Sequence, residues 1–252
     1  MDIYRYEKNQ LKSFDTLIGA AGTEREQCPV ISVVGAGGKT TTLRRLAEEY
    51  VKSGRKAAVI TTTHIAEEEK PWFLAEEEGK PGGKVMVERI LETYGQVWAG
   101  MRCGNGKLTM VSEKLLEAVR GSGAVILIEA DGAKRKPLKC PAEHEPVILP
   151  ETTHVFAVYG LDAVGKQFGE VCFRHEYAER LLGRKNTDCV RTEDIALLAA
   201  SEKAGRKRCP DHAAYTVILN KADSGKEKAY AEEIAERLTE MGIDRVLVTS
   251  HR

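Results

Sequence analysis

The sequence has no long apolar run and no excess of charge of either sign. No stretch approaches the roughly eighteen consecutive apolar residues of a membrane-spanning helix, and residues 1–9 are polar, unlike the apolar core of a signal peptide. Lys and Arg number 38, as do Asp and Glu, so no strong field attracts nucleic acid or an anionic membrane. We therefore expect a cytoplasmic protein that binds neither nucleic acid nor membranes.

Closely spaced cysteine pairs are also lacking. None of the six cysteines lies in a C-x-x-C pattern, which excludes a zinc knuckle or a dithiol redox motif of that spacing. Cytosolic thiols stay reduced, and we interpret the cysteines as structural or incidental.

Short apolar segments alternate with helical patterns along the chain. This order predicts an α/β fold with a doubly wound, mostly parallel sheet of the P-loop NTPase type. The length of 252 residues fits one such domain, 1–252. The apolar segments with the length of buried strands are 30–34, 57–60, 124–128, 155–159, 215–219 and 246–249.

Three segments are expected to add to this sheet. A partial stripe of apolar residues predicts a lead-in helix within 1–20. The turn signal Gly104-Asn105-Gly106 predicts a β-hairpin insertion at about 96–111. A helical decoration is expected at about 176–204.

A glycine-rich turn follows the first apolar segment and opens a helix. It reads Gly35-Ala36-Gly37-Gly38-Lys39-Thr40-Thr41. Glycines let backbone N–H groups turn around an anion, and the start of the helix adds partial positive charge. Lys39 is placed to reach the β- and γ-phosphates and Thr40 to ligate Mg²⁺. We predict that this run binds the phosphates of a nucleoside triphosphate.

The spacing of this turn does not choose the base. The standard pattern G-x-x-x-x-G-K-[ST] requires glycine where Val33 stands. The shorter G-x-x-G-K-T resembles the loop of Mur-type ligases and folylpolyglutamate synthetases, which bind ATP.

Carboxylates follow the apolar segment 124–128, in the run Glu129-Ala130-Asp131-Gly132. A carboxylate at the end of a buried strand is the usual Mg²⁺-binding partner of a phosphate loop. Glu129 and Asp131 are the candidate metal ligands together with Thr40, and Lys39 and Asp131 are the candidate catalytic residues.

Two further groups are candidates for the substrate or water side of the site. Because ligands lie beyond the carboxyl ends of parallel strands, the residues after segment 57–60 are expected to face the phosphates, although threonines are also good strand formers. A basic run after Asp131 is expected either to bind an anion or to form a solvated loop. The first group is Thr62, Thr63 and His64, and the basic run contributes Lys134 and Lys139. In a kinase or ligase, His144 would line the acceptor site together with that run.

A base-reading signature follows segment 215–219. Asn220-Lys221-Ala222-Asp223 matches the N-K-x-D motif of GTP-binding proteins. A carboxylate accepts two hydrogen bonds from guanine, and adenine offers no such pair of donors. Ser250 ends the last apolar segment, where GTP-binding proteins place a second base-contacting loop. These residues favour GTP over ATP.

Together these motifs resemble the YqeC family. That resemblance implies an accessory role in the maturation of selenium-dependent molybdenum hydroxylases, or in selenium cofactor biosynthesis, and extends over about residues 30–250. The segments that carry it are 34–41, 61–65, 129–133, 137–139, 143–146 and 220–223.

Three functions remain open from the sequence. The first is a slow, Mg²⁺-dependent GTPase that acts as an accessory protein in hydroxylase maturation. The second is an ATP-dependent kinase or ligase acting on a small cofactor precursor, and the third is a nucleotide sensor without catalysis. A homodimer is compatible with each of them.

Overall fold

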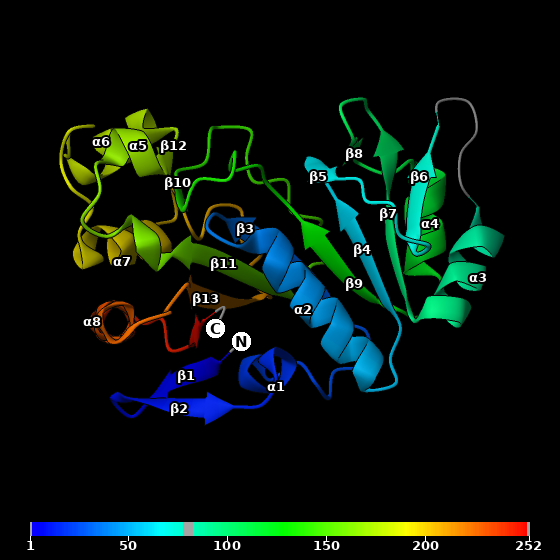
Figure 1. Cartoon of the computed structure of the whole chain (residues 1–252), viewed down its shortest axis with the longest axis horizontal. Helices are drawn as coiled ribbons and strands as arrows, with labels where there is room; N and C mark the ends of the chain where they lie inside the picture. Colours follow the sequence, from blue (N-terminus) through cyan, green and yellow to red (C-terminus); the bar gives the residue numbers. More distant parts are fainter. Residues whose placement is uncertain (1, 78–82, 251–252) are drawn as a thin grey trace.

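A twelve-stranded sheet forms the centre of the computed structural model, which describes residues 2–77 and 83–250 (Figure 1). Its strands lie in the order β2-β1-β14-β13-β11-β3-β9-β4-β7-β8-β5, and β6 pairs with β7 beside this path. The bounds of the strands are β1 Ile3–Glu7, β2 Gln10–Phe14, β3 Val30–Gly35, β4 Ala57–Thr61, β5 His64–Ala66, β6 Phe73–Glu76, β7 Gln96–Arg102, β8 Lys107–Thr109, β9 Val125–Glu129, β11 His154–Gly160, β13 Ala214–Asn220 and β14 Val246–Thr249.

Most of this sheet is parallel. From β14 through β13, β11, β3, β9 and β4 to β7, every pair of neighbours is parallel. Antiparallel pairing occurs toward the two edges, where β1 pairs with β14 and β8 with β7. All residues of β9 and β11 are buried, as expected for apolar strands that are covered on both faces.

Helices cover both faces of the sheet. The core on one face contains side chains of α1 and α2, including Leu17, Leu43 and Leu46. The core on the other contains side chains of α3, α4, α7 and α8. The predicted doubly wound α/β fold is therefore confirmed. The bounds of the helices are α1 Leu17–Ala21, α2 Lys39–Lys52, α3 Lys84–Tyr94, α4 Glu113–Arg120, α5 Phe168–Val171, α6 His175–Leu182, α7 Thr192–Ala200 and α8 Gly225–Glu240, with a 3₁₀ turn η1 at Leu161–Ala163.

The N-terminal segment corrects the prediction of a lead-in helix within 1–20. Residues 3–14 form the hairpin β1–β2, and only α1 at Leu17–Ala21 is helical. Lys8 and Asn9 both have positive φ, 50° and 62°, which is the conformation of a two-residue hairpin turn. The edge of β14 provides the hydrogen-bonding partner for β1, and this long-range pairing outweighs the partial helical stripe.

The other two predicted segments have defined places in the structure. β7 and β8 pair antiparallel at 101–102 and 108–109, but β7 also runs parallel to β4, so the first arm of the hairpin belongs to the main sheet. Helices α6 and α7 lie in the segment after β12. A small parallel pair, β10 Leu138–Lys139 with β12 Cys172–Phe173, stands apart from the main sheet.

The direction of the chain reverses at β3 and β11, which are neighbours. From β3 the chain passes through α2 to β4 on one side, and from β11 it passes to β13 on the other. In open α/β sheets, ligands bind beyond the strand ends at such a switch point. The glycine-rich turn after β3 lies there. Among the described residues, no helix has the length and apolar character needed to cross a membrane.

Candidate functional site

The glycine-rich turn packs tightly against the ends of neighbouring strands. Gly37 has φ of 78°, and a Cβ there would lie 2.4 Å from the backbone nitrogen of Gly160, at the end of β11. Gly38 has φ of 142°, and its Cβ would lie 2.0 Å from Nδ2 of Asn220 at the end of β13. Both positions therefore require glycine, for backbone conformation and for space.

Two N–H groups of the turn are already bonded within the protein. The N–H of Ala36 donates to the Val158 carbonyl at 2.8 Å, and that of Gly37 donates to the Lys136 carbonyl at 3.1 Å. The first N–H groups of α2 have no acceptor within the helix, and its N-cap Gly38 offers no side-chain cap. The start of α2 is therefore the part of the turn that is best suited to hold an anion.

Lys39 and Asp131 form a buried ion pair under the turn. Nζ of Lys39 lies 3.2 Å from Oδ1 of Asp131 and donates to the Gly35 carbonyl at 2.8 Å. Oδ2 of Asp131 accepts from the Gly35 N–H at 3.1 Å and lies 3.1 Å from Nζ of Lys139. Asp131 thus neutralises two lysines and fixes the first residue of the turn. Its predicted roles in metal binding and catalysis would require these contacts to rearrange.

The ion pairs continue from Lys139 to Glu145, which lies in the loop between β10 and β11. Nζ of Lys139 lies 2.6 Å from Oε2 of Glu145, and Glu145 also pairs with Arg174. Burial acts to raise the pKa of the Glu145 carboxyl, but the bonds and charges of Lys139 and Arg174 outweigh it and hold that pKa below its usual value. Neither Glu145 nor Arg174 is among the site residues predicted from the sequence. The alternating charges become apparent only when the chain is folded.

Thr40 and Glu129 meet at the start of α2. Oγ1 of Thr40 donates to Oε2 of Glu129 at 2.9 Å. Burial raises the pKa of the Glu129 carboxyl above its usual value, although the charge of Lys39 and the hydrogen bond from Thr40 act in the opposite direction. Hydroxyl and carboxylate oxygens are ligands that Mg²⁺ accepts, so this pair fits a magnesium ion and would hold it. Within the described ranges, no cluster of three or more His, Cys, Asp or Glu side chains is placed to hold a metal ion. Thr41, the last residue of the predicted phosphate-binding run, is exposed.

The residues after β4 lie near the carboxylate strand but differ in exposure. Thr62 donates its hydroxyl to the Val147 carbonyl at 2.8 Å, and its N–H donates to the Glu129 carbonyl at 3.1 Å. The buried Oγ1 of Thr63 has no hydrogen-bond partner within the described part of the chain. His64 is exposed in β5, as is His144 in the loop before β11.

Asn220 links the predicted base-reading motif to the glycine-rich turn. Its Nδ2 donates to the Gly37 carbonyl at 2.7 Å, and its Oδ1 accepts from the Thr249 hydroxyl at 2.8 Å. One buried amide therefore joins the turn after β3 to the ends of β13 and β14.

The other predicted base-contacting residues, Lys221, Asp223 and Ser250, differ in burial and in their partners. Lys221 pairs through Nζ with Oδ2 of Asp162 at 2.8 Å, and Asp223 is half-buried. Ser250 is only 1% exposed. Its hydroxyl accepts from the Asp2 N–H at 3.3 Å and its N–H donates to the Asp2 carbonyl at 3.0 Å. Asp2, which precedes the N-terminal strand, therefore covers Ser250, and a contact of this side chain with a base stays a prediction.

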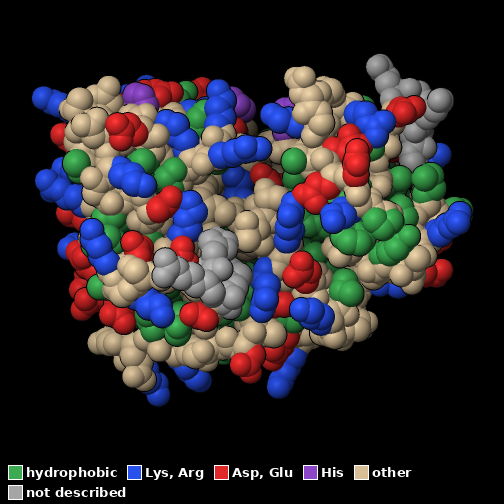
Figure 2. All heavy atoms as spheres, in the orientation of Figure 1, with side chains coloured by type: hydrophobic (Ala, Val, Ile, Leu, Met, Phe, Trp, Pro, Cys, Tyr) green, Lys and Arg blue, Asp and Glu red, His purple; other side chains and the backbone are tan. Residues whose placement is uncertain are grey.

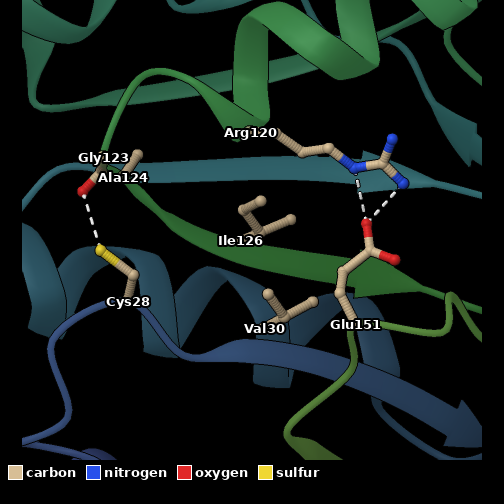
Figure 3. Close-up of a pocket in the computed structure, with 7 residues that line it drawn as sticks. All are labelled: Cys28, Val30, Arg120, Gly123, Ala124, Ile126 and Glu151. Atoms are coloured by element: carbon tan, nitrogen blue, oxygen red, sulfur yellow. Dashed lines mark hydrogen bonds and ion pairs between the residues drawn. The ribbon is translucent and has the colours of Figure 1, made fainter.

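A hollow lies near the top centre of Figure 2, between the side that carries α5 and α6 and the side that carries the β7–β8 hairpin. Lys and Arg side chains lie along it. A separate cavity of about 440 Å³ lies at the opposite, N-terminal ends of β3 and β9. Figure 3 shows its apolar floor of Val30 and Ile126 and, at its rim, the ion pair between Arg120 and Glu151. The predicted phosphate-binding residues do not line it.

Comparison with known proteins identifies relatives of this chain. The chain is 27% identical over 223 residues to Uncharacterized protein YqeC of Escherichia coli (strain K12), a match that covers 86% of this chain and 85% of the relative. Among solved structures, it is similar to the signal recognition particle 54 kDa protein from Aeropyrum pernix K1 in complex with GDP. The TM-score is 0.41 with 15% identity, over 90% of this chain and 43% of that one, so this chain spans less than half of that protein. The family model described as YqeC protein matches residues 31–176. The chain therefore belongs to the YqeC family.

Proposed function

We propose that the protein binds GTP with Mg²⁺ at the start of α2 and hydrolyses it slowly. The observation that carries this proposal is the meeting of three groups at one helix N-terminus: the first N–H groups of α2, which have no acceptor within the helix, the Lys39 ammonium, and the Thr40–Glu129 pair. They supply an anion site, a cation and a magnesium site at the switch point of the sheet.

The role of Lys39 requires a change in its partner. In the structure, its ammonium is neutralised by Asp131 and bonded to the Gly35 carbonyl. Phosphate oxygens offer a stronger set of acceptors than one carbonyl and one shared carboxylate. On binding, Lys39 is expected to turn to the β- and γ-phosphates and to stabilise the charge that develops during transfer. Asp131 then keeps Lys139 as its cation.

The preference for guanine rests on Asp223, supported by the position of its motif. Asn220 ties the motif to Gly37 of the phosphate turn, so a base held near Asp223 and phosphates held at α2 are compatible with one bound nucleotide. The Asp223 carboxylate would accept both guanine N–H groups. The stem of Lys221 would lie along the base, with its ammonium held by Asp162.

An accessory role in the maturation of selenium-dependent molybdenum hydroxylases completes the proposal, and it rests on the family resemblance of the motifs. The GTPase would act by ordering loops around the bound nucleotide and so changing the surface offered to the hydroxylase.

Calorimetric titration of GTP and of ATP into the purified protein, each with Mg²⁺, tests the proposal. We expect GTP to bind at least about tenfold more tightly than ATP, because a bidentate charge-assisted contact is lost with adenine. Asp223→Ala should remove this preference, and Lys39→Ala should weaken both nucleotides. A preference for ATP would contradict the guanine assignment and favour the kinase or ligase, which the G-x-x-G-K-T spacing also fits.

A further inference from the structure

Lys134 and Arg135 form an exposed basic turn, named here by these two residues, between β9 and β10. Within residues 2–77 and 83–250, neither side chain makes an ion pair, and Lys134 contacts only the ring of Phe173, with Nζ 5.3 Å from its centroid. The lysines that follow are satisfied: Lys136 donates to the Gly169 carbonyl at 2.9 Å, and Lys139 lies between two carboxylates. The basic turn therefore holds two uncompensated positive charges.

The backbone of the basic turn is strained and firmly anchored. Lys134 and Arg135 have φ of 47° and 61°, a left-handed conformation that is unfavourable for residues with a Cβ. The next two carbonyls bond to the glycine-rich turn and to the end of β11: that of Lys136 accepts from the Gly37 N–H, and that of Pro137 accepts from the Gly160 N–H at 3.0 Å. Strained backbone held by its surroundings is typical of ligand sites, and these bonds fix the turn beside the phosphate loop.

A half-buried aromatic ring lies next to the basic turn. Parallel pairing of β10 with β12 brings Phe173 to this position. Besides Lys134, the guanidinium carbon of Arg174 lies 4.7 Å from the ring centroid. Arg174 also has left-handed φ, 60°, and pairs with Glu145. The site thus combines two exposed cations, a paired cation and an aromatic surface.

We propose that the basic turn, with Phe173 beside it, binds a second anion: the phosphate or carboxylate group of a small molecule distinct from the nucleotide. Two adjacent cations without acidic partners among residues 2–77 and 83–250 provide the charge-assisted donors that such a group requires. Anchoring through Lys136 and Pro137 holds this anion beside the phosphate loop. This site adds to the proposed nucleotide site and does not depend on it.

Pyrophosphate titrated calorimetrically into the full-length protein tests for the second site. We expect two bound pyrophosphates in the wild type. Lys134→Ala/Arg135→Ala should weaken one of them roughly tenfold or more, because charge-assisted contacts are lost. Lys114→Ala/Lys203→Ala is the matched control: it removes the same charge from exposed positions elsewhere and should keep both sites.

Two further variants separate this inference from folding effects and from the proposed function. Lys134→Gly/Arg135→Gly suits the left-handed backbone and should lose the same site as the alanine variant. Lys39→Ala should remove the other site; if it leaves both, the proposed phosphate site fails while the inference stands. Unchanged binding in both basic-turn variants, or a single site abolished equally by Lys39→Ala and by the basic-turn variants, would overturn the inference.

Discussion

Removal of the Asp131 carboxylate is expected to destabilise the protein strongly. Its side chain is 3% exposed and lies within 3.2 Å of the Lys39 and Lys139 ammonium groups, whose side chains are 4% and 1% exposed. Lys139 keeps Glu145 as a partner after Asp131→Ala, whereas within residues 2–77 and 83–250 the Gly35 carbonyl is the one hydrogen-bond partner left to the Lys39 ammonium. Breaking a buried pair so that one charge is left uncompensated costs about 3–5 kcal/mol.

Urea denaturation of the nucleotide-free protein measures this loss as a change in the free energy of unfolding. Glu151→Ala is the control, since it breaks an ion pair with Arg120 whose two side chains are 31% and 38% exposed; such surface pairs contribute up to about 1 kcal/mol. The double variant Asp131→Ala/Lys39→Met removes both charges and should recover at least about 1.5 kcal/mol relative to the sum of the single variants. A loss for Asp131→Ala no larger than that of the control would refute the reasoning.

Three more outcomes follow from the geometry of the site and the core. Gly38→Ala should abolish nucleotide binding in calorimetry, because its Cβ would lie 2.0 Å from Nδ2 of Asn220 and because the φ of 142° at this position disfavours a side chain. Binding at wild-type strength would show that the turn adopts another conformation. Glu129→Gln should reduce the enhancement of GTP binding by Mg²⁺ about tenfold, since the carboxylate beside Thr40 is the proposed magnesium ligand. GTP binding without Mg²⁺ should change little. An unchanged magnesium dependence would exclude Glu129 as a magnesium ligand. Burial lowers the pKa of the His154 imidazole below 6.5, although the nearby carboxylate of Glu26 acts to raise that pKa. The unfolded chain therefore takes up a proton at this residue more readily than the folded protein, and the free energy of unfolding should fall as the pH drops below 6.5. His154→Gln should lose less stability than the wild type between pH 7.5 and 5.5 in urea denaturation, and an equal loss would argue against this assignment.

Parts of the site were predictable because their information is local. The apolar segment 30–34, the glycines after it and the helical pattern over 39–52 are contiguous, and each favours its own conformation wherever the chain goes. The same holds for the apolar strand that ends at Glu129. Because carboxyl ends of parallel strands share one edge of a sheet, the approach of Thr40 to Glu129 also follows from the pattern.

Other parts depended on contacts between distant segments. The hairpin β1–β2 replaces the predicted helix within 1–20, because β14, at the other end of the chain, offers an edge with which β1 pairs. The same pairing buries Ser250 against Asp2, 248 positions away.

By itself, the sequence determined the parallel α/β fold, the position of the glycine-rich turn at the start of α2 and the carboxylate strand beside it. Only the tertiary structure decided which charges meet. It placed Asp131 between Lys39 and Lys139, joined Asn220 to Gly37, and put the exposed basic turn beside the glycine-rich turn. The propensity for a helix or a strand depends on residues that are neighbours in the chain. The energy of an ion pair depends on the distance between two charges in space, and this distance does not follow from their spacing in the sequence.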